Sequence, residues 1–224
     1  MRATARIVAA AGGRLPVLRS EAPLLVRRTG PATVHLVGGA AGPLGGDRLR
    51  LEIVVGPAAD LTVRSVAATV ALPGAGAGSS RTDVVVEVAA GGRLRWLPEP
   101  LVAAAGCRHE AVTTVDLAPD ARLVWREELV CGRHGEEPGD ATLRANVRLD
   151  GRPLYRHDLA VGPHAPGWAG GAVLGGARAY GSLLVVNEAP PEVPATLLAL
   201  AGPGVLAVAV GPDARAVRAA LTAG

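Results

Sequence analysis

Apolar and polar residues alternate with a period of two over the first two thirds of the chain. Apolar side chains recur at every second position from Leu49 to Val55, and again from Val84 to Val88. Successive side chains of a β-strand point to opposite faces of its sheet, so this period predicts half-buried strands. We therefore expect a mainly β fold.

Turn-forming residues interrupt these runs at four places, and a leucine opens the run that follows each turn. The turns are Gly56-Pro57, Gly91-Gly92, Pro119-Asp120 and Asp150-Gly151. The leucines are Leu61, Leu94, Leu123 and Leu154, separated by 33, 29 and 31 residues. A recurrence near 30 residues favours stacked strand–turn–strand units, an irregular β-helical arrangement of stacked sheets. A β-sandwich with evenly spaced turns fits the same pattern.

Helical structure is expected only near the C-terminus, as one or two short helices. Asp213 can cap the run from Ala214 to Thr222, which is rich in helix formers. Because no long linker divides the chain, residues 1–224 are expected to form a single domain.

Composition narrows the class of protein. Apolar residues make up 49 % and charged residues 19 % of the 224, which excludes a wholly disordered chain. With no Phe, the core must consist of Val, Leu and Ala. The net charge of +3 is mild, and the sequence shows neither aromatic platforms nor a basic stripe, so no nucleic-acid partner is expected.

The apolar segments are too short for targeting or membrane insertion. The run from Ile7 to Ala11 is shorter than a secretory h-region, and the stretch from Thr196 to Val210 is interrupted by Gly202-Pro203-Gly204. Cys107 and Cys131 do not make a disulfide framework. We expect a cytoplasmic protein without a membrane partner.

Several motifs offer candidate chemistry without completing a site. The segment from Gly38 to Asp47 lacks the Lys and Ser or Thr of a phosphate loop, which leaves a tight corner holding the Asp47 carboxylate. Glu127 and Glu128 should face opposite ways on a strand, and a partly buried Glu127 would need a partner or a passing cation. A four-ligand metal set is also possible, although its spacing is unlike that of structural zinc: Cys107, His109, Cys131 and His134.

A series of motifs, in order, resembles the urease accessory protein UreD (UreH) family. The motifs are Gly-Gly-Asp47, Gly56-Pro57, Ala67-Ala-Thr69, Leu94-Arg-Trp-Leu-Pro-Glu99, Ala121-Arg-Leu-Val-Trp125 and Cys131-Gly-Arg133. The likeness runs from Val34 to Gly162 and again from Pro194 to Ala219, and the segment from Val66 to Pro73 looks most like the actinobacterial branch.

The resemblance implies a non-enzymatic urease maturation factor with an irregular β-helical fold. It implies binding to a UreF-like protein, recruitment of the GTPase UreG and docking on apo-urease. Nickel(II) would pass through an internal tunnel, in transit and not as a stably bound cofactor. Matching the family's motifs residue by residue places Asp47, Glu127 and His157 on this nickel path, with Glu99 as a further candidate.

Two departures from the family and two other functions remain open. Gly38 to Pro43 replaces a His-Pro-Pro-Gly-Gly run, and Val70 to Gly74 stands where relatives carry Lys-x-Tyr-Arg. The alternatives are a stand-alone metalloprotein using the Cys/His set and a β-rich interaction module that needs no metal.

Overall fold

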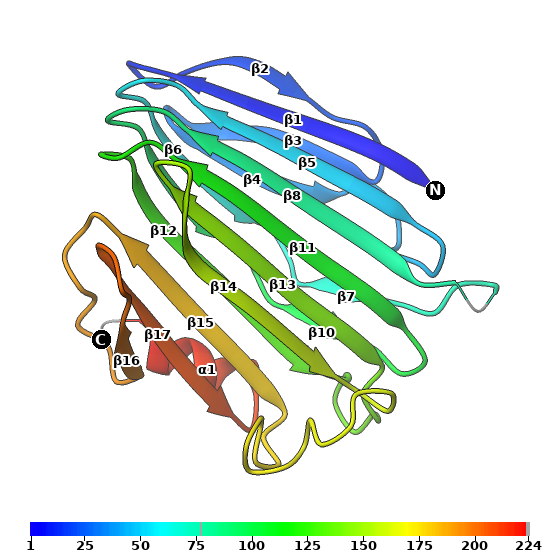
Figure 1. The fold of residues 1–224 in the computed structure, drawn as a ribbon. Coiled ribbons are helices and arrows are strands. Elements are labelled where there is room, and N and C mark those ends of the chain that lie inside the picture. The colour runs from blue at the N-terminus through cyan, green and yellow to red at the C-terminus, as the bar shows by residue number, and fades with distance from the viewer. Residues whose placement is uncertain (77, 223–224) are drawn as a thin grey trace.

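Two β-sheets stacked face to face form the body of the molecule (Figure 1). The computed structural model describes residues 1–76 and 78–222, so residues 77, 223 and 224 of the predicted domain lie outside it. Sheet A has seven strands, in the spatial order β14 (Arg152–Val161), β13 (Asp140–Leu149), β11 (Arg108–Leu117), β8 (Ser80–Val88), β5 (Arg48–Val55), β1 (Arg2–Ala10) and β2 (Arg14–Arg19).

Sheet B lies behind sheet A in the view of Figure 1. Its main path is β16 (Thr196–Ala199), β17 (Gly204–Gly211), β15 (Ala179–Val186), β12 (Arg122–Cys131), β9 (Arg93–Leu97), β6 (Asp60–Ser65), β4 (Thr33–Gly38) and β3 (Leu24–Gly30). Two short strands extend it, because β10 (Leu101–Ala103) pairs with β12 and with β7 (Thr69–Ala71).

The chain crosses repeatedly from sheet A to sheet B, as in a β-solenoid. Strand β5 leads to β6, β8 to β9 and β11 to β12. Within each sheet, successive strands of this series are parallel and in register. Each coil therefore stacks on the one before it, which confirms the mainly β, stacked-sheet prediction.

The predicted leucine frame is correct for three coils and wrong for the fourth. Leu61, Leu94 and Leu123 occupy one rung of sheet B, and all three are fully buried. Leu154 lies instead on β14, which turns back antiparallel to β13 in sheet A. Asp150 and Gly151 both have positive φ, +51° and +70°, a geometry that closes a two-residue hairpin instead of sending the chain to the other sheet.

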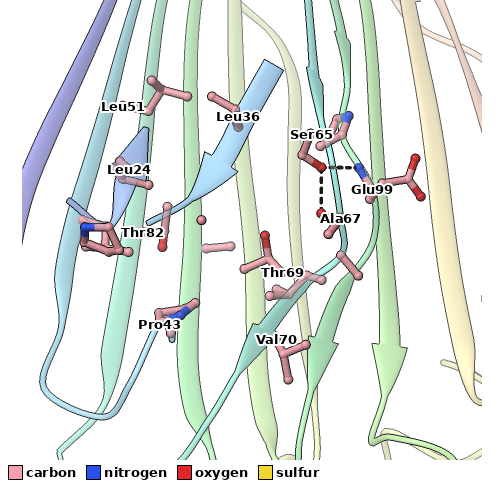
Figure 2. A pocket seen from close by; sticks show the side chains of 18 of the residues that line it. Leu24, Leu36, Pro43, Leu51, Ser65, Ala67, Thr69, Val70, Thr82 and Glu99 are labelled. Atoms are coloured by element: carbon pink, nitrogen blue, oxygen red, sulfur yellow. Dashed lines mark hydrogen bonds between the residues drawn. The ribbon is translucent and has the colours of Figure 1, made fainter. Parts of the chain in front are cut away.

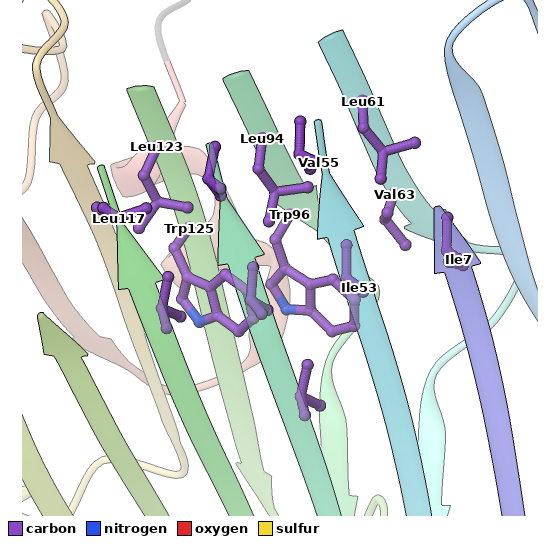
Figure 3. Close-up of a cluster of buried hydrophobic side chains, with 14 of the residues drawn as sticks. Ile7, Ile53, Val55, Leu61, Val63, Leu94, Trp96, Leu117, Leu123 and Trp125 are labelled. Carbon is purple, nitrogen blue, oxygen red and sulfur yellow. The ribbon is translucent and has the colours of Figure 1, made fainter. Parts of the chain in front are cut away.

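Two stacked tryptophans occupy the rung after these leucines (Figure 3). Trp96 and Trp125 are register partners, and their ring centroids lie 4.8 Å apart at an interplanar angle of 11°. Since identical coil positions stack in a solenoid, a tryptophan at the same place in two coils pairs face to face. Around the pair, the core between the sheets consists mainly of Val, Leu and Ala, as predicted.

One helix, α1 (Ala214–Leu221), covers the outer face of sheet B. The Asp213 side chain accepts a hydrogen bond from the Ala216 N–H at 2.8 Å, which confirms the predicted cap. Val217 and Leu221 pack on outward-facing residues of β15 and β17. Within residues 1–76 and 78–222, no helix has the length and apolar character needed to cross a bilayer.

Candidate functional site

A cavity of about 520 Å³ lies between the two sheets and reaches the surface beside the ends of β4, β6 and β9. Figure 2 shows Leu24, Leu36 and Leu51 among the apolar side chains that form its wall. Polar residues are a minority of its lining: Ser65, Thr69, Thr82, Glu99, His109, Thr113, Glu127 and Glu128. A single ionisable group in this apolar setting would dominate the local electrostatics.

Glu127 provides such a group. Strand alternation on β12 turns it inward together with Trp125 and Leu129, toward the cavity. Its Oε1 accepts one hydrogen bond, from the Thr113 hydroxyl of sheet A, at 3.1 Å. Burial raises the pKa of the Glu127 carboxyl, and the neighbouring Trp125 indole and Thr113 hydroxyl offset this only in part.

Glu128 has the opposite surroundings, as the alternation predicts. It faces outward from sheet B, where Arg218 of α1 donates to both of its oxygens at 2.5 and 2.6 Å. Arg126 lies 3.4 Å from the same carboxylate. Glu128 is thus neutralised and anchors the helix to the sheet, so it is not available as a ligand.

Glu99 lies at the mouth of the cavity, in the segment that follows β9. Its backbone N–H donates to the Ser65 hydroxyl at 2.8 Å, the bond drawn in Figure 2. Its carboxylate accepts two longer bonds from Arg218, both 3.3 Å, and 40 % of its side chain stays exposed. Arg218 therefore links the helix to the rim of the cavity.

His157 lies on the inner face of β14 and is not part of the cavity lining. Its ring stacks between Tyr155 and Tyr180, with centroids at 6.1 and 5.6 Å. Its Nδ1 is buried and has no hydrogen-bond partner among the residues that the structure describes. Burial lowers the pKa of His157, partly opposed by Asp158, so the imidazole is neutral at pH 7 and keeps a free nitrogen. Burial raises the pKa of both tyrosines, and the Glu127 charge adds to the effect.

The corner between Gly42 and β5 holds the Asp47 carboxylate, as predicted, and both carboxylate oxygens have partners. One accepts from the Met1 ammonium at 2.7 Å and the other from the Leu44 N–H at 2.9 Å. Burial raises the pKa of Asp47, but these two hydrogen bonds and the ammonium charge outweigh it, so the net shift is downward. Gly42 and Pro43 of this corner line the cavity; the Asp47 side chain does not.

The predicted residues do not assemble into one ligand cluster. No three His, Cys, Asp or Glu side chains lie close enough together to hold a metal ion anywhere in residues 1–76 and 78–222. The Cys/His set is also dispersed, because His134 is exposed while both cysteines are buried in a separate apolar cluster. His109 pairs instead with the Ser80 hydroxyl at 2.9 Å, and burial lowers its pKa to about 4.

Three residues of this region were not predicted from the sequence: Thr113, Tyr180 and Arg218. Thr113 interrupts an apolar alternation on β11, a weak signal of a polar position inside the core. Arg218 lies 90 residues from Glu128, and no local pattern relates positions so far apart. Its role follows only from the docking of α1.

Comparison of the sequence with known proteins shows which family it is similar to. A family model described as UreD urease accessory protein matches residues 2–223. "Urease accessory protein UreD" of Streptomyces avermitilis is 49 % identical, covering 99 % of this chain and 95 % of the relative. The proteins of the same name from Parafrankia sp. (strain EAN1pec) and Streptomyces coelicolor are 45 % and 46 % identical; each alignment covers 97 % of this chain, and 84 % and 93 % of the relative.

Proposed function

The chain belongs to the UreD family of urease accessory proteins, and from that premise we propose that it delivers nickel(II) to apo-urease as a scaffold without catalytic turnover. Membership implies a role in urease maturation. The observation that carries the finer proposal is the Glu127 carboxylate, which faces a cavity of about 520 Å³ and has one hydrogen-bond donor.

Nickel(II) is a borderline cation that carboxylate and imidazole groups bind well. A carboxylate in an apolar wall attracts a passing cation because little else compensates its charge. Glu99 at the mouth and Glu127 in the wall offer carboxylate oxygens at the cavity, and the unpaired Nδ1 of His157, outside the cavity lining, offers a nitrogen donor. Because these donors are separated, each would bind the nickel ion weakly and release it quickly, which transfer requires.

In this proposal Asp47 acts on the shape of the cavity wall and does not bind nickel itself. Its bond to the Leu44 N–H holds the corner whose Gly42 and Pro43 line the cavity. We expect substitutions there to change nickel transfer by shifting the corner and not by removing a ligand.

The partners in this proposal are a UreF-like protein, a UreG-like GTPase and apo-urease, in the cytoplasm. They follow from the family resemblance. Arg218 offers a physical link between such partners and the path, because it joins α1 to Glu99 at the mouth. A protein that binds near α1 would thereby act on the cavity entrance.

The test is the nickel content of urease purified from a urease-operon host that lacks this gene. Restoring the wild-type chain should restore nickel, whereas Glu127→Gln should leave urease largely nickel-free. Glu87→Gln is the matched control, because Glu87 is exposed on the outer face of β8. Fully loaded urease without the chain would refute the delivery role, and full loading with Glu127→Gln would refute the path.

A further inference from the structure

Four outward arginines of sheet A lie within salt-bridge distance of acidic neighbours: Arg50 with Glu52 at 2.8 Å, Arg81 with Asp83 at 2.7 Å, Arg144 with Asp158 at 3.0 Å and Arg148 with Asp116 at 3.9 Å. Opposite charges side by side on a sheet face stabilise it, so these four arginines need no partner protein to balance their charge. Arg2 and Arg48, at one end of β1 and β5, have no such pair among the described residues.

A larger group of arginines without ion pairs lies on the outer face of sheet B, over β3, β4, β6 and β9. Alternation with the buried residues Val26, Val34, Val63, Leu94 and Trp96 turns four basic side chains outward, a set we call the basic face: Arg27, His35, Arg64 and Arg95. Among the residues that the structure describes, no carboxylate lies within 4.0 Å of these three arginines.

Strand register brings these side chains together. Arg27, His35 and Arg64 occupy one rung across three strands, so neighbours lie about 5 Å apart along the hydrogen-bonding direction. Arg95 stands opposite Thr62, and its Nε donates to the Thr62 hydroxyl at 3.1 Å. Arg64 and Arg95 lie on the adjacent strands β6 and β9, where like charges repel, and neither forms an ion pair within 4.0 Å among the described residues.

Asp60 lies on the same outer face of β6, opposite Arg93 in the register, and the other acidic groups near this face have arginine partners elsewhere. Arg218 binds both Glu99 and Glu128, and Glu188 pairs with Arg93 at 2.5 Å. At one end of the basic face, just after β6, Val66 is 58 % exposed and also lines the cavity mouth. Unpaired arginines around an exposed apolar residue are typical of a protein–protein interface.

We propose that the basic face is a docking surface for an acidic patch of a partner protein, with Val66 in the apolar part of the contact. Charge complementarity identifies the partner's chemistry, since carboxylates placed over these arginines would balance their charge. A protein fits better than a single-stranded nucleic acid, because Trp96 and Trp125 point inward and leave no aromatic platform on this face. The inference concerns the surface alone and holds whether or not nickel crosses the cavity.

The test is a binding measurement on the purified full-length chain. The probes are the cognate apo-urease and each cognate accessory protein, added singly. The double variant Arg64→Glu/Arg95→Glu should weaken binding of at least one probe by about tenfold or more. The double variant Arg50→Glu/Arg148→Glu makes the same charge change on sheet A and should stay within about twofold of wild type. Equal affinities of both double variants for every probe would overturn the proposal.

Two further measurements distinguish a specific loss of binding from misfolding of the double variant. Wild-type affinity for the responding probe should fall steeply between low and high NaCl, and Arg64→Gln should weaken it less than the double variant does. A salt-independent affinity would contradict the proposal. It would also be overturned if charge reversal changed binding only to a DNA duplex or to phosphatidylserine vesicles, which are run in parallel. Nickel loading of urease is a separate readout, so failure here leaves the proposed function standing.

Discussion

At the scale of single residues, Glu127 and Glu128 show how one step along a strand changes the chemistry of a carboxylate. Glu127 faces the cavity with one donor, Thr113, while Glu128 faces outward against Arg218. The burial that raises the pKa of Glu127 also makes its charge costly to the fold. Residues retained at such a cost are candidates for function.

The cost predicts how Glu127→Gln changes stability with pH. The raised pKa keeps the carboxyl protonated in the folded chain after the unfolded chain has ionised near its ordinary value of 4.5. Wild-type stability therefore falls as pH rises from about 4.5 through the folded pKa, and the loss persists above it. The amide does not ionise, so the variant should be more stable at pH 8 by about 1–3 kcal/mol and nearly equal at pH 4.

Urea denaturation at both pH values measures this difference. The control is Glu87→Gln, whose exposed carboxyl should give less than about 0.5 kcal/mol at either pH. An equal gain for Glu127→Gln at pH 4 and pH 8 would contradict a buried, costly charge.

Gly139 is a position where the fold admits no side chain. A Cβ there would overlap the Ala104 carbonyl oxygen and lie 2.6 Å from the Cys107 Sγ. We expect Gly139→Ala to lower the free energy of unfolding by about 3 kcal/mol, since backbone and sulfur must both shift. Gly171→Ala, where nothing lies within 4 Å, should be neutral within about 0.5 kcal/mol. Thermal denaturation compares them, and equal midpoints would show that the contact relaxes freely.

At the scale of elements, α1 is held on sheet B by an apolar strip and by one cation. Val217 and Leu221 provide the apolar contact. Arg218 provides the charge, and its hydrogen bonds to Glu128 raise the pKa of its guanidinium. The helix is eight residues long, too short to persist alone, so its order depends on these contacts.

Arg218→Met tests the contribution of the cation. It leaves the buried Glu128 with Arg126 alone at 3.4 Å, and we expect a loss of about 2–3 kcal/mol in unfolding free energy, somewhat less than for a pair with no remaining cation. The matched control is Arg215→Met, because Arg215 is exposed on the same helix. Guanidinium denaturation followed by circular dichroism measures both variants. A loss shared equally by both would assign the effect to helix propensity.

The strands themselves were predictable, and one connection was not. Period-two alternation identified β5 and β8, and the turn-plus-leucine frame correctly predicted three stacked coils at Leu61, Leu94 and Leu123. The same frame failed at Leu154, because positive φ at Asp150 and Gly151 reverses the chain into a hairpin. Spacing alone does not distinguish a turn that crosses between sheets from one that stays in the same sheet.

At the scale of the whole molecule, dispersed ligands predict weak retention of metal. The described residues contain no cluster of three potential ligands, so the isolated chain dialysed against metal-free buffer should hold far less than one nickel per chain. Elemental analysis after incubation with nickel(II) and dialysis measures this. A full equivalent that resists a chelator would contradict transit and favour the Cys/His alternative.

The candidate site was predictable only in part. Glu127 was identified because a carboxylate in an apolar strand is unusual, and the structure places it at the cavity. The corner was expected to hold the Asp47 carboxylate in a fixed direction, and both of its oxygens have partners there. Whether Asp47, Glu99, Glu127 and His157 carry nickel stays a prediction. The cavity could not be foreseen, since its wall combines residues from both sheets.

Local sequence patterns were sufficient to predict the class of fold, the strand periodicity, the capped helix and the opposite orientations of Glu127 and Glu128. These features depend on interactions within a few residues, which local patterns record. The crossing of the coils, the bond between Arg218 and Glu128, the cavity and the basic face depend on contacts between residues far apart in the chain, so they follow only from the three-dimensional arrangement. The sequence shows no basic stripe, because Arg27, Arg64 and Arg95 are far apart along the chain. The antiparallel pairing of β3 with β4 and the parallel stacking of β4, β6 and β9 bring them onto one surface.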